Sequence, residues 1–450
     1  MTTKPLFSIS GLRGIINQDL NSEYITEVCT GFGSFLGAGK VALGRDCRAS
    51  SEMLFYAATA GLLATGCEVV NLGVCPTPTV LFNVKQLGLA GGIVITASHN
   101  PEEWNGLKFV SKEGVFLNED EINELKRLLK SKNFKRAGIS EIKSIKDEPE
   151  AVENHIKKIL RSEYFRDIPV KKFVIGIDAC NGAALAAVTS LLQAMGSTPA
   201  HLFCDTIRPG QFPRKPEPRA ENLESLSSFV KEKKLDLGVA FDPDGDRVSF
   251  VDEKGFALGE EASLLIALSF ILKKKLGPVV VNLSTSQAVD DIAAKFSVPV
   301  YRTKVGEAAV VAKMKEVGAV IGGEGNGGVI LPEINFTRDG ITATAILIHL
   351  LSDSEIALSE IADSLPKYFM QKISVPYQAK DWANKKSKIK KSFAPTQFNQ
   401  EDGLKINGKD FWVHIRPSNT EPIIRVIAES KLSSYTSDMI NKAKEILLAS

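Results

Sequence analysis

One pattern occurs three times in this chain of 450 residues and constrains its fold more than any other feature. β-Branched runs alternate with amphipathic stretches, and each repeat ends in a glycine, an apolar strand and a loop of small polar and charged residues. Strands that alternate with helices predict βαβ units and a largely parallel sheet. Binding groups gather in loops beyond the carboxyl ends of such strands. We therefore expect function in the loops TASHNP, DPDGDR and GEGNGG.

Periodicity and glycine positions assign the elements of the repeats. Strands are predicted over residues 40–46, 67–73, 91–96, 171–178, 235–241, 277–285, 298–306 and 319–323. Helices are predicted over residues 53–66, 79–88, 183–196, 287–296 and 308–318. After residue 403 the chain resumes with strand-like segments and a final helix over 437–448, which is too little for a fourth repeat.

Changes in composition divide the chain into four expected domains. The charged stretch Lys143–Glu153 ends the first, a turn near Asp252 ends the second, and a Lys-rich stretch around Pro366–Phe393 precedes the tail. The predicted domains are residues 1–150, 151–252, 253–367 and 368–450. The predicted fold class is α/β, with three similar α/β domains on mostly parallel mixed sheets and a smaller C-terminal α+β domain.

Composition argues against several classes of protein. Lys and Arg total 55 against 53 Asp and Glu, and a formal charge of +2 gives no field that favours nucleic acid or a membrane surface. The longest apolar stretches, Leu264–Leu272 and Ala343–Leu351, are shorter than the roughly 20 residues that span a bilayer and predict buried helices. No signal-peptide pattern opens the chain and the six cysteines form no CxxC pair, so a cytoplasmic location with free, buried thiols is expected.

The loop TASHNP follows an apolar strand directly, so the Ser98 hydroxyl could serve there as a nucleophile or phosphate carrier. The alternative is that Ser98 and Asn100 only shape a turn before Pro101. No GxSxG pattern surrounds this serine, and an acyl-transfer triad is a poor fit.

The loop DPDGDR places Asp242, Asp244 and Asp246 at alternate positions around Gly245. Carboxylates at this spacing can converge on one hard cation such as Mg²⁺. A calcium loop of the EF-hand kind would need a Glu where Val251 stands. The alternative is a solvated acidic turn, but three neighbouring carboxylates repel one another unless a cation or a basic group offsets them.

Two further loops suggest recognition of a sugar and of a phosphate. In GGEGNGG, glycines flank Glu324 and Asn326, so backbone can approach a ligand while a carboxylate and an amide project toward sugar hydroxyls. In RPSNTEP, small hydroxyl residues follow Arg416 in the manner of a phosphate-binding nest, without a Walker pattern. The alternatives are a glycine-rich turn for the first loop and a structural helix cap for the second.

Together and in this order, FSISGLRG, TASHNP, DPDGDR, GEGNGG and RPSNTEP resemble the α-D-phosphohexomutase family of phosphoglucomutases, phosphomannomutases and phosphoglucosamine mutases. The resemblance covers essentially the whole chain. It implies four domains, the first three of one α/β topology, in agreement with the repeats.

The resemblance also implies roles for individual residues. Ser98 would carry the transferable phosphoryl group and, with the three aspartates, would hold Mg²⁺. The other candidate catalytic residues are Arg13, Lys108, His99 and Arg247. The substrate-binding residues would be Glu324, Asn326, Lys304, Arg416, Ser418, Asn419, Thr420 and Arg425.

Four features depart from the family pattern. The opening FSISG replaces the more frequent FGTSG, although Arg13 is retained, and GEGNG replaces GEESG, which affects the hydroxyl contacts of Asn326. Asn419 stands where Gly is frequent, which fits because Asn visits left-handed conformations. Glu307 stands where the family often has His or Asp.

The activity implied is that of a phosphohexomutase, which interconverts a hexose 1-phosphate and 6-phosphate through a phosphoserine and a sugar bisphosphate. The best guess for the hexose is glucosamine, and a phosphomannomutase/phosphoglucomutase of broad specificity is the alternative. A phosphatase and a non-catalytic sugar-phosphate-binding protein are the other readings. One Mg²⁺ per active site and a hexose 1,6-bisphosphate activator are expected. The partners would be hexose phosphates, with neither nucleic acid nor membrane, for a monomer or homodimer.

Overall fold

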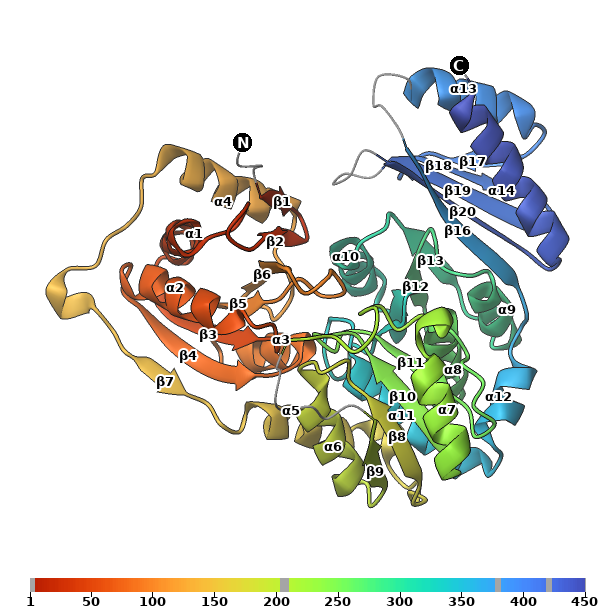
Figure 1. Ribbon diagram of the computed structural model, residues 1–450, viewed down its shortest axis with the longest axis horizontal. Helices are drawn as coiled ribbons and strands as arrows, with labels where there is room; N and C mark the ends of the chain where they lie inside the picture. The colour runs from red at the N-terminus through yellow and green to blue at the C-terminus, as the bar shows by residue number, and fades with distance from the viewer. Residues whose placement is uncertain (1–4, 203–209, 377–381, 418–422, 450) are drawn as a thin grey trace. The chain divides into compact units, whose positions relative to one another are not determined.

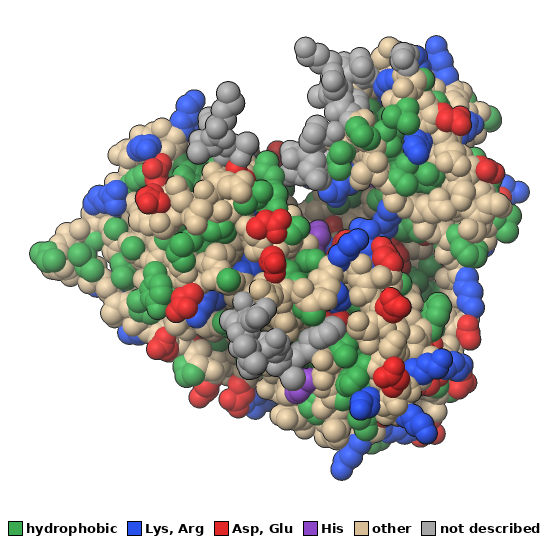
Figure 2. All heavy atoms as spheres, viewed as in Figure 1, with side chains coloured by type: hydrophobic (Ala, Val, Ile, Leu, Met, Phe, Trp, Pro, Cys, Tyr) green, Lys and Arg blue, Asp and Glu red, His purple; other side chains and the backbone are tan. Residues whose placement is uncertain are grey.

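The computed structural model describes residues 5–202, 210–376, 382–417 and 423–449. The chain forms two compact units. Unit 1 comprises Met1–Lys274 and Asn326–Asp363, and unit 2 comprises Lys275–Gly325 and Ser364–Ser450. Charged side chains of both signs lie on the visible face in Figure 2.

Unit 1 begins with a seven-stranded mixed sheet of order β1-β2-β6-β5-β3-β4-β7 (Figure 1). Its strands are β1 (Leu6–Ser8), β2 (Gly11–Ile15), β3 (Gly39–Arg45), β4 (Cys67–Val74), β5 (Gly91–Ile95), β6 (Trp104–Ser111) and β7 (Ile145–Asp147). The predicted parallel part is confirmed, since β5, β3, β4 and β7 pair in parallel. The antiparallel strands β1, β2 and β6 were not assigned from the sequence. For β1 and β2 the reason is that FSISGLRG is too short and too polar to show a strand period.

Helices cover both faces of this sheet. They are α1 (Ser22–Leu36), α2 (Ser51–Leu63), α3 (Thr77–Gln86) and α4 (Glu119–Ser131). In β3, Val41 and Leu43 pack with residues of α1, α2 and α4, whereas Ala42 packs with residues of α3. Successive strand residues point to opposite faces, so a strand that is apolar at every position is buried on both sides.

The second sheet of unit 1 has the order β11-β10-β8-β9. Its strands are β8 (Val174–Asp178), β9 (Thr198–His201), β10 (Leu237–Phe241) and β11 (Val248–Val251). The helices that follow or cover them are α5 (Ala151–Leu160), α6 (Ala184–Ala194), α7 (Glu224–Lys233), α8 (Glu260–Lys274), α11 (Gly340–Ser354) and α12 (Leu358–Ser364), and β15 (Gly328–Ile330) contacts α8 and α11. The two apolar stretches lie in α8 and α11 and are buried, as predicted.

Unit 2 contains the third parallel sheet, in which β12 (Val279–Asn282) pairs with β13 (Val300–Thr303) and with β14 (Ile321–Glu324). Its helices are α9 (Ala288–Lys295) and α10 (Glu307–Val317). The tail forms an antiparallel sheet of order β16-β20-β19-β18-β17. These strands are β16 (Phe369–Pro376), β17 (Gln397–Asn399), β18 (Leu404–Asn407), β19 (Phe411–Pro417) and β20 (Ile423–Ser430).

Helices α13 (Trp382–Ser392) and α14 (Ser433–Leu448) share one core with the strands of this last sheet (Figure 1). The predicted α+β tail is therefore confirmed, although β16 and α13 lie in the Lys-rich stretch where apolar periodicity is weak. Within the described residues, no single helix is long and apolar enough to cross a membrane. The bent pair α11 and α12, at 94°, passes that test together by length and composition only. Cys29, Cys47, Cys67, Cys75 and Cys180 are free, and all but the partly exposed Cys47 are buried.

Candidate active site

Ser98 lies three residues beyond the end of β5, at the carboxyl edge of the sheet. Its side chain is buried, and its backbone adopts φ 53°, a left-handed conformation that is uncommon outside glycine. The Ser98 N–H donates to Thr96 Oγ1 at 2.8 Å, which fixes the turn. A strained backbone at a buried hydroxyl is typical of functional positions.

The guanidinium of Arg48 holds the Ser98 loop in this conformation. Its Nη2 donates to the carbonyls of Ser98 (2.6 Å) and Asn100 (2.8 Å), and its Nη1 donates to those of Pro101 (2.5 Å) and Trp104 (2.9 Å). Four carbonyls from one loop therefore converge on one cation. Sequence analysis did not select Arg48, although it follows β3 in the sequence GRDCR, at the same edge of the sheet.

Asp46 anchors this arginine. Its carboxylate accepts from Arg48 Nε and the Arg48 N–H, both at 3.0 Å. It also accepts from the hydroxyls of Ser51 and Thr96 at 2.7 Å. A buried ion pair whose remaining polar atoms are all hydrogen-bonded is rigid, so Asp46 and Arg48 fix the position of Ser98.

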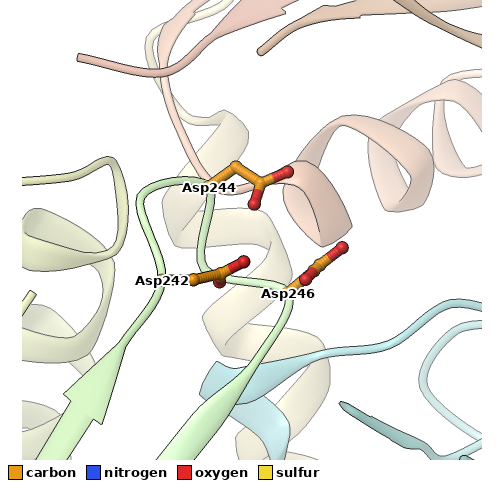
Figure 3. Close-up of side chains that lie close together, drawn as sticks. All are labelled: Asp242, Asp244 and Asp246. Atoms are coloured by element: carbon orange, nitrogen blue, oxygen red, sulfur yellow. The ribbon is translucent and has the colours of Figure 1, made fainter. Parts of the chain in front are cut away.

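The three aspartates occupy the loop between β10 and β11, and their carboxylates face one another (Figure 3). All three are buried, and one oxygen from each lies within 4.8 Å of the others. Gly245 has φ 67°, which allows the sharp turn between Asp244 and Asp246. Ser98 Oγ lies 3.1 Å from Asp242 Oδ2, so the structure brings the serine and the acidic loop together.

Basic side chains surround the acidic loop on the other sides. Lys108 Nζ lies 2.7 Å from Asp244 Oδ2 and 3.3 Å from Asp246 Oδ2. Arg338 Nη2 lies 2.7 Å from Asp246 Oδ2, and Arg247 Nε lies 3.7 Å from Asp246 Oδ1. Arg338 was not selected from the sequence, because a lone arginine in FTRDG matches no motif.

The aspartate pKa values reflect these neighbours. Burial, then the charges of Asp246 and Asp244, raises the pKa of Asp242 well above its usual range. Burial also works to raise the pKa of Asp246, but Arg338 and Lys108 outweigh it and lower that pKa. Burial and the two neighbouring carboxylates therefore disfavour the charged form of Asp242, which has only Arg247 Nε, at 4.0 Å, as a basic neighbour among the ion pairs described.

A metal ion fits these residues. Asp244 Oδ1 and Asp246 Oδ1 are buried and have no hydrogen-bond partner among the described residues. Together with Asp242 they supply an all-oxygen donor set, which suits a hard divalent cation.

The remaining predicted catalytic residues also lie in unit 1. Arg13 Nη1 donates to Asn100 Oδ1 at 2.8 Å, and Arg247 Nη1 lies 2.9 Å from Glu217 Oε1. His99 Nδ1 lies 3.3 Å from Ser98 Oγ. Burial, followed by the charge of Arg247 and then that of Arg13, lowers the pKa of His99 well below its usual value, so the ring is neutral at pH 7.

Two helix starts hold the acidic loop in place. At the start of α3, the Thr77 N–H donates to the Asp244 carbonyl at 2.8 Å and Thr77 Oγ1 donates to Asp244 Oδ2 at 2.6 Å. At the start of α11, the Gly340 N–H donates to the Gly245 carbonyl at 3.2 Å.

Buried His155 links these two helix starts. Its Nε2 lies 2.9 Å from Asp339 Oδ2, and its Nδ1 lies 3.1 Å from Thr79 Oγ1. Asp339 also caps α11 by accepting from the backbone N–H groups of Ile341 and Thr342. The pair His155 and Asp339 therefore fixes α3 and α11 relative to each other and, through them, the acidic loop.

Unit 2 contains Glu324, the carboxylate of the predicted sugar-recognition loop GGEGNGG. Glu324 ends β14 and is buried, and its Oε1 accepts from Asn282 Nδ2 (2.8 Å) and from the Gly306 N–H (3.1 Å). Lys304 lies in the turn after β13, and Glu307 is the first residue of α10 and is buried. Asn326 lies just beyond β14, at the start of the second segment of unit 1.

The two predicted phosphate-binding arginines face each other across strands of unit 2. Arg416 on β19 pairs directly with Arg425 on β20. Like charges opposite each other in a sheet are unfavourable unless an anion offsets them. Arg416 Nε is buried without a hydrogen-bond partner among the described residues. Ser418, Asn419 and Thr420 lie outside the described residues.

Family models match nearly the whole chain. Phosphoglucomutase/phosphomannomutase α/β/α domain I matches residues 4–136, domain II matches 153–255, domain III matches 259–369, and the C-terminal domain matches 372–441.

Relatives and solved structures agree. A phosphoglucosamine/phosphogalactosamine mutase from Sulfurisphaera tokodaii is 33% identical over 98% of this chain and 99% of the relative. A phosphoglucomutase/phosphomannomutase from Thermococcus kodakarensis is 36% identical over 95% of this chain and 94% of the relative. A crystal structure of a phosphoglucomutase/phosphomannomutase family protein from Burkholderia thailandensis superposes with a TM-score of 0.85 at 25% identity, over 99% of each chain. The predicted fold class and family are confirmed: this chain belongs to the phosphoglucomutase/phosphomannomutase family of phosphohexomutases.

Proposed function

We propose that the protein interconverts glucosamine 1-phosphate and glucosamine 6-phosphate through a phosphorylated Ser98. The observation that carries the catalytic part is the buried contact of 3.1 Å between Ser98 Oγ and Asp242 Oδ2, within a ring of basic residues. The choice of sugar is supported by relatives such as the phosphoglucosamine/phosphogalactosamine mutase of Sulfurisphaera tokodaii.

In the proposed cycle, the phosphoryl group leaves Ser98 Oγ and bonds to the free hydroxyl oxygen of the bound sugar phosphate. The hydroxyl proton goes to neutral His99, and His99 Nδ1, 3.3 Å from Ser98 Oγ, can pass a proton to that oxygen as its bond to phosphorus breaks. The sugar bisphosphate then turns over and returns its other phosphoryl group to Ser98. Transfer of this kind needs in-line placement and charge neutralisation, which Lys108, Arg247 and Arg13 supply.

Lys108 acts in this scheme as a fixed positive charge. Burial opposes its charged form, but the carboxylates of Asp244 and Asp246 outweigh burial and raise its pKa, so it stays protonated at neutral pH. A protonated amine neutralises the charge on a transferring phosphoryl group and cannot serve as the base.

We propose that Asp242, Asp244 and Asp246 hold one Mg²⁺ together with Ser98. Mg²⁺ would offset the negative charge of the acidic loop and of the transferring group. Chelation should abolish turnover and added Mg²⁺ should restore it, whereas full activity of Asp244→Ala in chelator would remove the metal from the scheme. A hexose 1,6-bisphosphate activator is expected, because it can phosphorylate Ser98 before the first cycle.

Unit 2 would bind the sugar and the phosphate that is not transferred. Arg416 and Arg425, with Ser418, Asn419 and Thr420, would bind that phosphate. Glu324 and Lys304 would contact the sugar, together with Asn326, which belongs to unit 1. The four-domain division, the cytoplasmic location and a monomeric or homodimeric state stay predictions.

One purified sample should be assayed on the 1-phosphates of glucosamine, N-acetylglucosamine, glucose and mannose. We expect the highest kcat/KM on glucosamine 1-phosphate. Similar values on glucose and mannose would instead indicate a mutase of broad specificity, as the name of the Thermococcus kodakarensis relative suggests for that protein. Release of inorganic phosphate without isomerisation would indicate a phosphatase, and binding without turnover would indicate a sensor.

A further inference from the structure

Asp402 lies in the turn before β18 and connects two parts of unit 2 through one carboxylate oxygen. Its Oδ2 accepts from Arg416 Nη1 at 3.2 Å and from the Val305 N–H at 3.0 Å. Gly403, with φ 73°, packs so closely on β19 that an added Cβ would lie 2.4 Å from the Ile415 carbonyl oxygen. The turn is therefore closely packed against the strand that carries Arg416.

The other partner of Asp402, the Val305 N–H, lies next to a residue that contacts Glu324. Val305 is followed by Gly306, whose N–H donates to Glu324 Oε1 at 3.1 Å. The same oxygen of Glu324 accepts from Asn282 Nδ2 at 2.8 Å. Three hydrogen bonds and the Val305–Gly306 backbone thus connect Arg416 to Glu324, and Asp402 accepts two of these bonds.

Buried His414 fixes the backbone of Asp402. Its Nε2 lies 2.6 Å from the Asp402 carbonyl, which can only accept, so Nε2 carries the proton and Nδ1 accepts from Ser284 Oγ at 2.8 Å. Burial lowers the pKa of His414 to about 4, so this neutral tautomer persists at neutral pH. Lys405 Nζ adds a second link by donating to the Leu283 carbonyl at 2.6 Å.

We propose that Asp402 is a positioning residue that aims Arg416 at the substrate phosphate and holds it in register with Glu324. The inference rests on the proposed function. If the sugar is bound in two orientations, the group that binds its phosphate, Arg416, and the group that contacts its hydroxyls, Glu324, must stay at a fixed separation. Asp402 sets that separation by hydrogen bonding, without touching the substrate.

The test compares Asp402→Ala, Asp402→Asn and the control Glu401→Gln, which changes an exposed neighbouring carboxylate. Both hydrogen bonds of Asp402 end on one oxygen, so an Asn amide oxygen can replace it while the charge is lost. Asp402→Ala should raise KM about 5- to 30-fold for both the 1-phosphate and the 6-phosphate, with kcat changed less than about threefold. Asp402→Asn should recover most of this loss, and Glu401→Gln should match the wild type.

A double-mutant cycle tests the route of the effect. Because Asp402 acts on the phosphate through Arg416, Asp402→Ala should add little to the KM of Arg416→Ala. Additive effects, or an unchanged KM in Asp402→Ala, would overturn the proposal, as would an Asp402→Asn variant as weak as Asp402→Ala. If Asp402→Ala fails to fold, the cycle is run with Asp402→Ser, whose hydroxyl is too short to reach both donors. Wild-type protein inactive on every hexose phosphate would instead refute the proposed function.

Discussion

The Ser98 centre of unit 1 and the residues proposed to bind phosphate in unit 2 are built differently. Around Ser98, every carboxylate of the acidic loop is buried and close to a basic group. In unit 2 the Arg416 and Asp402 side chains are 16% and 24% exposed, and Arg425 is exposed on the surface. Phosphoryl transfer at one phosphorus atom needs a single fixed geometry. A phosphate-binding site that serves two substrate orientations must instead be accessible. The difference predicts that substitutions in unit 1 affect mainly the rate and those in unit 2 mainly substrate affinity.

Ser98→Ala, in unit 1, is expected to have the largest effect on the rate. Without the phosphoryl carrier, kcat should fall at least about 10,000-fold, while folding is retained because one buried hydroxyl is lost. Intact-mass measurement should show a phosphoryl adduct on active wild type and none on the variant. The exposed Ser131→Ala serves as the control. Substantial activity in Ser98→Ala, together with no adduct on the wild type, would exclude Ser98 as the carrier.

Arg48→Met tests whether unit 1 depends on a fixed loop. The variant leaves Asp46 buried without its partner, so the free energy of unfolding should fall by about 3–5 kcal/mol. With the Ser98 loop released, kcat should fall about 100- to 1,000-fold in protein that urea titration shows to be folded. Arg48→Lys keeps the charge but cannot reach four carbonyls, so it should recover stability more than kcat. Exposed Arg127→Met is the control. A folded Arg48→Met with normal kcat would show that Arg48 is not needed to hold the Ser98 loop.

Arg48 also shows what the sequence could and could not predict. The repeated strand and loop pattern located Ser98 and the aspartates, because a loop at the carboxyl end of a parallel strand is a local feature. Arg48, Arg338 and Thr77 act through contacts with residues 50 to 167 positions away. No local pattern distinguishes them from ordinary surface residues. The same limit applies to Asp402, whose partners lie on separate segments of unit 2.

Arg416→Ala tests unit 2. Loss of a charge-assisted hydrogen bond should lower kcat/KM about 10- to 150-fold, mostly through KM. The loss should be equal from the 1-phosphate and the 6-phosphate sides if, as proposed, one loop binds both. Exposed Lys409→Ala is the matched control for lost positive charge. A defect confined to one direction would mean two separate phosphate sites.

The smallest effects concern two buried histidines, one in each unit. His349 stacks on Phe165 with ring centroids 4.1 Å apart, and neither ring nitrogen has a hydrogen-bond partner among the described residues. His414 has two hydrogen-bond partners. At pH 7, His349→Phe should change the free energy of unfolding by less than about 1 kcal/mol, whereas His414→Phe should lower it by about 1–3 kcal/mol. Urea titration of both variants checks this, and equal losses would contradict the contrast.

The pH dependence of the free energy of unfolding tests the role of His349 separately. Burial lowers the pKa of His349 to about 4, below its ordinary value of 6.5. The unfolded chain therefore binds the extra proton first, and stability is lost as pH falls from about 6.5 toward 4. His349→Phe should reduce this slope. An unchanged slope between pH 7 and pH 4.5 would show that His349 is not its source.

The acidic loop pairs with residues that are far from it in the sequence, which affects the order in which the protein can fold during synthesis. Lys108 pairs with Asp244 across 136 residues, Arg338 with Asp246 across 92, and His155 with Asp339 across 184. A nascent chain that has emerged only as far as β11 contains all three aspartates but lacks Arg338 and the start of α11. Burying the loop at that stage would leave Asp246 without Arg338, its nearest basic partner at 2.7 Å, which is unfavourable. The centre should therefore close late in synthesis, and a chain interrupted before residue 338 should expose a protease-sensitive acidic loop that the finished protein protects.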